Sequence, residues 1–212
     1  MSNNTIITIG RQYGSAGREI GQLVAEQLGI KYYDKELLKK AASESGLCEE
    51  LFENHDEKPT NSFLYSLVMD TYSIGYSPSA FVDMPLNHKV FLAQFDTIKK
   101  IADQESCVIV GRCADYALAD YKNCLSVFIH AKLEDRIQRI AKKYNLTDTK
   151  AKELILKTDK GRASYYNYFT SKKWGDVTSY QLSLDSSMVG VEGTAQIIRE
   201  YLELKLKDTP HI

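Results

Sequence analysis

A glycine-rich segment near the start of the chain carries the residue types that bind phosphate groups. It reads Gly10-Arg11-Gln12-Tyr13-Gly14-Ser15-Ala16-Gly17-Arg18-Glu19 and lies between an apolar run and a helical pattern. Glycines allow successive backbone N–H groups to turn toward an anion, and the start of a helix adds a partial positive charge. A cation at the end of such a loop reaches the terminal phosphates of a nucleotide, and Arg18 occupies that position.

The spacing of this segment departs from the standard phosphate-binding pattern GxxxxGK[ST]. The interval from Gly10 to Gly17 is longer than the pattern allows, and the interval from Gly14 is shorter. Arg18 stands in place of the lysine, and Glu19 in place of the hydroxyl that holds magnesium. A glycine-rich turn that only starts a helix is the alternative. Small residues fill every position from Gly14 to Gly17, next to an arginine, which favours phosphate binding.

The elements around the loop predict a β–loop–α–β opening. Residues 5–9 form a short, mostly β-branched strand that ends at Gly10. Apolar residues recur at helical spacing after the loop, and Gly29 closes this helix. A second strand over 30–33 completes a segment of about 30 residues, which is the size of a βαβ unit.

Strands and helices alternate along the rest of the chain. Asp34 is placed to cap a helix over 35–45, and further helices are predicted over 90–102, 133–144, 147–174 and 192–206. Continuous apolar runs at 107–110 and 125–129 are typical of strands buried on both faces of a parallel sheet, and 180–184 gives a last short strand. This alternation predicts an α/β fold with a parallel, doubly wound sheet, in a single domain over 1–212.

The stretch 47–86 fits this alternation least well. Its apolar clusters are separated by Gly75, Ser77 and Pro78. We interpret it as a helical insertion with a loop, within an acceptor-binding segment of about 35–86, rather than as a separate domain. A homodimer that uses this stretch is an open alternative.

Five stretches of the chain, taken together, match the motifs of one family. They are ITIGRQYGSAGREIG, LGIKYYDKELL, VIVGRCADYAL, DKGRASYYNYFTSKKWGD and YQLSLDSS. They resemble the cytidylate kinase-like family, the relatives of bacterial cytidylate kinase, from Ile6 to about Ile198. The resemblance implies a P-loop NTPase fold, with a parallel five-stranded sheet flanked by helices, a helical insertion and a lid at about 132–173. It also implies ATP as donor, with Mg²⁺.

The resemblance also implies roles for particular residues. The donor-binding residues would be Gly10, Gly14, Ser15, Ala16, Gly17, Arg18 and Glu19, with Ser15 and Glu19 as candidate Mg²⁺ ligands. Arg112, directly after the strand 107–110, matches an arginine that contacts the acceptor nucleotide. Asp159 and Arg162 match a pair that reads a pyrimidine monophosphate, and Asp34 matches the start of the acceptor segment.

Basic residues of the predicted lid complete the candidate site. Arg136 and Arg139 lie one turn apart on one helix face. With Arg18 they would neutralise the charge that develops in phosphoryl transfer, where positioning and electrostatics do most of the catalytic work. A solvated face is the alternative for Arg136 and Arg139. An ordinary helix pair is the alternative for Asp159 and Arg162.

The composition argues against other classes of function. Charged residues make up 26% of the 212 residues but cancel to a net charge of −1, whereas nucleic-acid binding uses a basic face. No apolar stretch approaches the roughly 20 residues of a membrane span, and the N-terminus lacks the basic region of a signal peptide. The four cysteines form no CxxC pair, so we interpret them as reduced core thiols. We expect a soluble, cytoplasmic protein whose partners are small-molecule nucleotides, not nucleic acid or membrane.

These observations lead to one hypothesis with two alternatives. The hypothesis is ATP-dependent phosphoryl transfer to a nucleoside monophosphate, namely CMP or dCMP. The first alternative is a P-loop kinase for another small acceptor. The second is a nucleotide-binding regulatory protein with little catalysis, which the absence of the loop lysine and hydroxyl suggests.

Overall fold

The centre of the protein is a parallel sheet of five strands. The computed structural model describes residues 4–46, 50, 52, 57 and 85–207. The strands are β1 (Ile6–Arg11), β2 (Lys31–Tyr33), β3 (Cys107–Val110), β4 (Cys124–His130) and β5 (Leu182–Asp185), in the order β2-β3-β1-β4-β5. Every strand pair is parallel, and β1 lies between β3 and β4. The predicted α/β fold with a five-stranded parallel sheet is confirmed.

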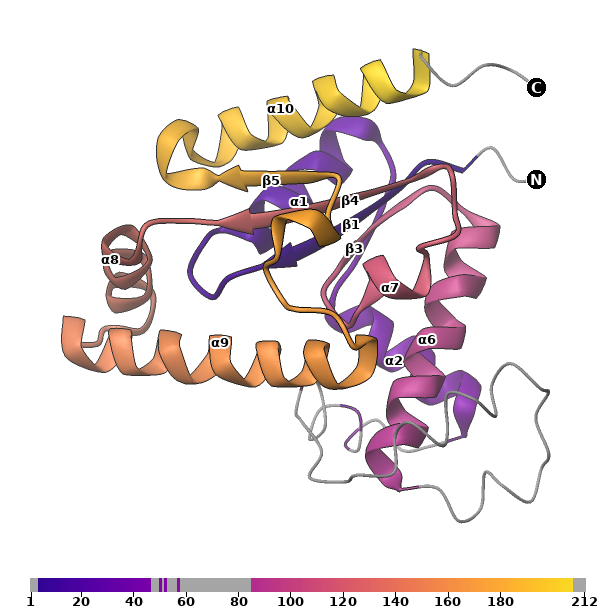
Figure 1. Ribbon diagram of the computed structural model, residues 1–212, viewed down its shortest axis with the longest axis horizontal. Helices are drawn as coiled ribbons and strands as arrows, with labels where there is room; N and C mark the ends of the chain where they lie inside the picture. Colours follow the sequence, from indigo (N-terminus) through magenta and orange to yellow (C-terminus); the bar gives the residue numbers. More distant parts are fainter. Residues whose placement is uncertain (1–3, 47–49, 51, 53–56, 58–84, 208–212) are drawn as a thin grey trace.

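Helices cover both faces of this sheet (Figure 1). One face carries α1 (Gly17–Leu28) and the C-terminal α10 (Ser186–Lys207), which pack against each other. The other face carries α6 (Leu86–Gln104) and the short α7 (Ala114–Ala117), and α2 (Lys35–Ser45) packs against α6. The sheet is therefore doubly wound, as the alternation of elements predicts.

Alternating strand residues supply the two layers of the core. Ile7 and Ile9 of β1 face α1 and α10, together with Val108 and Val110 of β3. Ile6 faces α6 and α7 on the opposite side of the sheet. Since successive strand side chains point to opposite faces, a strand buried on both faces has to be apolar throughout. This requirement accounts for the continuous apolar runs of the sequence.

The predicted elements differ from the observed ones mainly at their ends. Gly29 and Gly46 take the left-handed conformation after α1 and α2, as expected of residues that close helices. Asp34 precedes α2, but its side chain makes no capping hydrogen bond, so the predicted cap is wrong. Its carboxylate is held by two arginines instead. The helix α7 was not predicted, because four residues give no readable period.

Two helices form a hairpin beside the carboxyl ends of the strands. They are α8 (Leu133–Tyr144) and α9 (Asp148–Thr170), and Figure 1 shows them next to the ends of β1 and β4. Ile140, Ala151 and Ile155 pack between the two helices, and Tyr13 of the loop after β1 packs against them. The predicted lid is therefore in contact with the glycine-rich loop.

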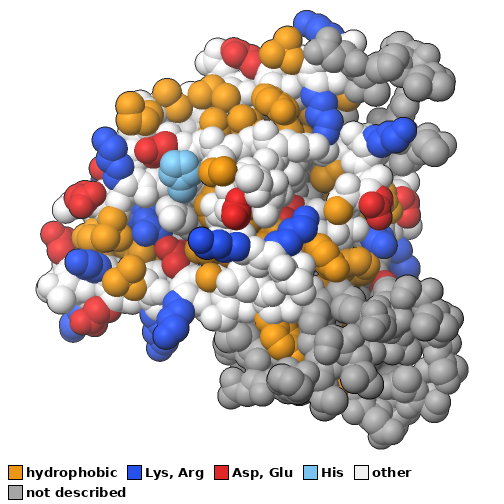
Figure 2. Space-filling view, in the orientation of Figure 1, with side chains coloured by type: hydrophobic (Ala, Val, Ile, Leu, Met, Phe, Trp, Pro, Cys, Tyr) orange, Lys and Arg blue, Asp and Glu red, His pale blue; other side chains and the backbone are white. Residues whose placement is uncertain are grey.

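The described surface shows charges of both signs. Figure 2 shows Lys and Arg side chains interspersed with Asp and Glu over the face in view. None of the helices in the described residues combines the length and the apolar character that crossing a membrane requires. Most of the predicted insertion at 47–86 lies outside the described residues.

Candidate functional site

The glycine-rich loop lies at the carboxyl edge of the sheet, between β1 and α1. The Gln12 N–H donates to the Ile129 carbonyl at 3.0 Å, which ties the loop to β4. The Ser186 hydroxyl donates to the Ser15 carbonyl at 2.7 Å, which ties the loop to α10. Gly14 and Ala16 both have positive φ, at 81° and 60°. The loop is therefore a tightly held turn that ends at the N-terminus of α1, the arrangement that favours an anion.

Because glycine has no side chain, other elements can approach this loop closely at its glycines. A Cβ atom on Gly14 would lie 3.1 Å from the Arg136 Cβ of α8. A Cβ on Gly17 would lie 2.5 Å from the Arg11 Cβ, closer than real Cβ atoms approach. Gly10 has a different surrounding, because it lies in β1 with the Phe128 ring 2.9 Å from the place of its Cβ. Gly14 and Gly17 shape the loop, whereas Gly10 makes room for an aromatic ring beside the strand.

A cavity of about 210 Å³ opens beside the loop. Seven positively charged side chains line it, against three carboxylates: Arg11, Arg18, Lys35, Arg112, Arg139, Lys143 and Arg162, against Glu19, Asp34 and Glu57. Walls of one predominant sign raise the local concentration of ligands of the opposite sign. The cavity is therefore suited to a polyanionic ligand.

The two candidate magnesium ligands lie in different environments. Ser15 is fully buried and its hydroxyl donates to the Gln12 carbonyl at 2.9 Å, so it lies outside the cavity lining. Glu19 lines the cavity, and its side chain is half exposed. Magnesium in nucleotide sites is held by one or two carboxylates together with substrate phosphates. Of the two residues, only Glu19 fits that description in this arrangement.

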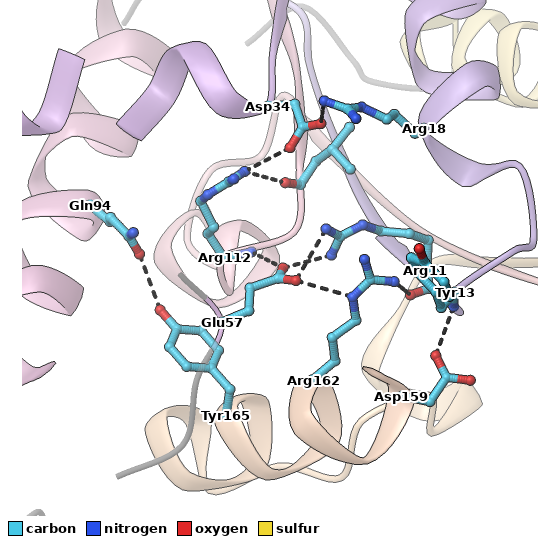
Figure 3. A network of polar contacts seen from close by, with 11 residues as sticks. Arg11, Tyr13, Arg18, Asp34, Glu57, Gln94, Arg112, Asp159, Arg162 and Tyr165 are labelled. Carbon is cyan, nitrogen blue, oxygen red and sulfur yellow. Dashed lines mark hydrogen bonds and ion pairs between the residues drawn. The ribbon is translucent and has the colours of Figure 1, made fainter. Parts of the chain in front are cut away.

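Asp34 joins two arginines that line the cavity with it (Figure 3). Its Oδ2 lies 2.5 Å from Nη2 of Arg18, and its Oδ1 lies 3.1 Å from Nη1 of Arg112. Burial lowers the pKa of Arg18, but Asp34 and Tyr32 together more than offset burial, so the pKa is raised. Arg112 is buried and Arg18 is half exposed, with side-chain exposures of 2% and 49%. Asp34 therefore links the loop cation to the arginine after β3.

A second carboxylate, Glu57, is held by four N–H groups (Figure 3). Arg11 donates from Nη1 to Oε1 at 2.6 Å and from Nη2 to Oε2 at 3.2 Å. Nε of Arg162 donates to Oε2 at 3.1 Å, and the backbone N–H of Arg112 donates to Oε1 at 3.1 Å. Each oxygen thus accepts two hydrogen bonds, so all four acceptor positions of the carboxylate are used.

The backbone after β3 aims the Arg112 N–H at this carboxylate. Gly111, Arg112 and Cys113 have φ values of 77°, 54° and 55°, three successive residues in the left-handed region. That conformation is costly for residues with a side chain and is concentrated at functional sites. In this turn the N–H of Arg112 donates to Glu57, and the guanidinium of Arg112 donates to Asp34.

The cations around Glu57 control its ionisation. Burial alone would raise the pKa of Glu57, but Arg11 and Arg162 more than offset burial and hold it well below the usual value of 4.5. Burial and the neighbouring charge of Arg11 lower the pKa of Arg162. Glu57 is therefore a carboxylate at any physiological pH.

This lowered pKa predicts how acid affects folding. A carboxylate whose pKa is lower in the folded state stabilises it above the unfolded pKa, and that stabilisation is lost as the pH falls through the folded pKa. We expect the free energy of unfolding of the wild type to fall more steeply below about pH 4.3 than that of Glu57→Gln. Urea denaturation at intervals between about pH 6 and pH 3 measures the free energy of unfolding of both proteins. Glu44→Gln, which loses an exposed ion pair to Lys100, is the control and should parallel the wild type. Parallel curves for Glu57→Gln would contradict the assignment.

Asp159 and the two lid arginines all contact the backbone of the glycine-rich loop. Asp159 accepts from the Tyr13 N–H at 2.7 Å and from Nη1 of Arg136 at 2.5 Å. Arg136, which is buried, also donates to the Tyr13 carbonyl at 3.2 Å, and Arg139 donates to the Gly14 carbonyl. Arg139 lines the cavity, whereas Asp159 and Arg136 do not. Asp159 and Arg136 thus clamp the loop between α8 and α9.

The structure brings most of the sequence candidates to one place. Arg18, Glu19, Asp34, Arg112, Arg139 and Arg162 all line the cavity with the loop. Sequence reasoning assigned no role to Arg11 or Glu57. Arg11 ends β1 at the same sheet edge as Arg112, and that position was a usable signal. Glu57 lies in the stretch 47–86, where no motif or period singles it out.

Sequence comparison finds one family along most of the chain. The sequence model of the cytidylate kinase-like family matches residues 6–188. The chain is 23% identical over 202 residues to a cytidylate kinase of Methanocaldococcus jannaschii. This match covers 93% of this chain and 97% of that protein. It is 21% identical over 208 residues to a cytidylate kinase of Sulfurisphaera tokodaii, with 97% and 99% covered.

Structural comparison finds the same kind of fold. A crystal structure of an uncharacterized protein from Eubacterium ventriosum matches with a TM-score of 0.71 at 27% identity, over 94% of this chain and 99% of that chain. A shikimate kinase from Bacteroides thetaiotaomicron matches with a TM-score of 0.53 at 16% identity, over 94% and 98%. At that identity the second match concerns the fold alone.

Proposed function

The chain belongs to the cytidylate kinase-like family, and we propose that it transfers the γ-phosphoryl group of ATP to CMP or dCMP. The observation that carries this proposal is that the glycine-rich loop lines the same cavity as Arg112 and Arg162. Donor and acceptor phosphates have to meet within one site, because phosphoryl transfer proceeds in line between two oxygens. The excess of cations around this cavity suits two phosphorylated ligands.

The donor half of the proposed reaction rests on the loop and α1. The loop backbone and the N-terminus of α1 would bind the phosphates of ATP, and Arg18 would contact the group in transfer. Arg139 lines the same cavity and would add a second cation. Magnesium bound with ATP would supply charge neutralisation at the phosphate oxygens, and Glu19, which lines the cavity, would help to hold it.

The acceptor half rests on the arginines at the ends of β1 and β3 and on α9. Arg112 lies directly after β3, at the sheet edge where ligands of doubly wound folds bind. Arg162 projects from α9 into the same cavity. Guanidinium groups bind phosphate through two parallel hydrogen bonds, which fixes orientation as well as charge. The phosphate of the acceptor is already an anion, so the reaction needs no side chain as a base.

An activity assay across all common nucleoside and deoxynucleoside monophosphates tests this proposal. With ATP and Mg²⁺, a coupled assay of ADP release should give the highest kcat/KM with CMP or dCMP. The Arg18→Ala protein, purified in the same way, controls for contaminating kinases. Turnover on a different monophosphate would replace the acceptor. ATP binding without turnover on any of them would contradict the kinase proposal and favour a regulatory nucleotide-binding protein.

A further inference from the structure

The four N–H groups around Glu57 have the form of an oxyanion binding site. Two come from the guanidinium fork of Arg11, one from Nε of Arg162 and one from the backbone of Arg112. They come from three separate elements of the fold, at the ends of β1 and β3 and in α9. Donors that converge in this way on both oxygens of one carboxylate also match two oxygens of a phosphate group.

A glycine leaves the space that this oxyanion occupies. A Cβ atom on Gly111 would lie 2.2 Å from Oε1 of Glu57 and 2.3 Å from Nη1 of Arg11. A side chain at this position would therefore force the carboxylate and its guanidinium partner to shift. The stem of Arg11 is accommodated in the same way by Gly17, whose Cβ would lie 2.5 Å from the Arg11 Cβ. Gly17 and Gly111 thus leave the space in which the Arg11 side chain and the oxyanion lie.

Glu57 itself is an imperfect occupant of the cradle formed by the four N–H groups of Arg11, Arg162 and Arg112. It supplies one negative charge against the two positive charges of Arg11 and Arg162, which a phosphate monoester dianion would balance. Its backbone has a φ of 49°, in the left-handed region that is unfavourable for a residue with a side chain. Both features make the carboxylate easier to displace than the quality of its hydrogen bonds suggests.

We propose that Arg11, Arg162 and the Arg112 N–H form the binding site for the phosphate group of the acceptor, and that Glu57 occupies this site until the acceptor displaces it. The inference rests on the proposed function in one respect, because the anion is taken to be the acceptor's phosphate. Glu57 then acts as an intramolecular competitor. A competitor of this kind lowers the apparent affinity by the fraction of molecules in which the site is open.

Calorimetric titration with inorganic phosphate, without nucleotide, tests the competition directly. Glu57→Gln keeps the shape of the side chain but removes its charge, so this variant should bind phosphate at least about tenfold more tightly than the wild type. Glu44→Gln removes a carboxylate from an ion pair with Lys100 outside the cavity, and its phosphate affinity should equal that of the wild type. Equal or weaker phosphate binding by Glu57→Gln would overturn the proposal.

A double-mutant cycle separates the cradle from the glycine-rich loop, which also binds phosphate under the proposed function. Arg11→Met keeps the stem beside Gly17 and removes the guanidinium. The tenfold gain in phosphate affinity should be absent when Arg11→Met/Glu57→Gln is compared with Arg11→Met, because the gain arises at the cradle and not at the loop. A gain that persists in the double variant would place the phosphate elsewhere and overturn the proposal.

A measurement on the wild-type protein keeps the test independent of how Glu57→Gln folds. Saturating phosphate should raise the pKa of the Glu57 carboxylate, followed by ¹³C NMR, because its arginine partners are then occupied. An unchanged titration would overturn the proposal. None of the three experiments requires turnover. A protein that passes all three but phosphorylates no monophosphate supports the cradle and refutes the kinase proposal, and an active kinase that fails them does the opposite.

Discussion

Replacing Arg18 with alanine should reduce kcat/KM for phosphoryl transfer at least about a hundredfold, the scale of removing one oriented donor to a transition-state charge. Arg18 follows directly on the glycine-rich turn, lines the cavity and is held by Asp34 at 2.5 Å. The guanidinium is therefore oriented before any ligand binds, which is the condition under which electrostatic stabilisation is most effective. The measurement is steady-state kinetics with the acceptor that the assay identifies.

Lysine should not restore the Arg18→Ala loss in full. The fork of a guanidinium contacts a carboxylate and a phosphate oxygen at once, whereas an ammonium group is a point charge on a flexible stem. Lys142→Ala is the matched control, because it removes an exposed cation from α8 that does not line the cavity. Its kcat/KM should equal that of the wild type. Unchanged kcat/KM in Arg18→Ala would remove the loop cation from the mechanism.

Asp159→Asn should lower the free energy of unfolding by about 3 kcal/mol, the lower end of the range for breaking a buried ion pair. The carboxylate contacts both the Tyr13 N–H and the buried guanidinium of Arg136. An amide at this place leaves the charge of Arg136 uncompensated in a buried position. Because the loop is clamped by the same carboxylate, KM for ATP should rise as well. Urea denaturation and initial rates measure the two effects.

Glu153→Gln controls for the loss of a carboxylate from the same helix, because Glu153 is exposed on α9. Its stability should remain within about 0.5 kcal/mol of the wild type, as is usual for surface substitutions. If Asp159→Asn instead changes only the kcat/KM ratio between CMP and UMP, at wild-type stability, Asp159 reads the base of the acceptor and the clamp described above is wrong.

Periodicity and turn residues predicted the parallel, doubly wound sheet, and the family resemblance implied its five strands. Continuous apolar runs are required of strands buried on both faces, so β3 was predicted with its exact bounds from its sequence alone. The helix α8 was also predicted with its exact bounds, because its apolar residues recur on one side only. The start of α10 was missed, because Gly190 interrupts the helical backbone close to its beginning.

The candidate site was predicted less completely than the fold, and the reason lies in how its residues meet. Arg18 was identified because it follows the glycine-rich turn, which is a local signal, and Arg112 was identified from the family resemblance. Glu57 contacts Arg162 across 105 positions of sequence, and no local pattern records a contact of that kind. The role of Asp159 was also hidden, because a carboxylate that accepts a backbone N–H leaves no trace in side-chain spacing.

The left-handed turn at Gly111–Cys113 has a consequence for mutational scanning of this protein. Arg112 contributes to one carboxylate through its side chain and to the other through its backbone N–H. Alanine at this position removes the contact of the side chain with Asp34 and keeps the contact of the backbone N–H with Glu57. An alanine scan therefore measures only the side-chain contact. The backbone contribution depends on the conformation of the turn, which begins at Gly111, and not on the side chain at 112.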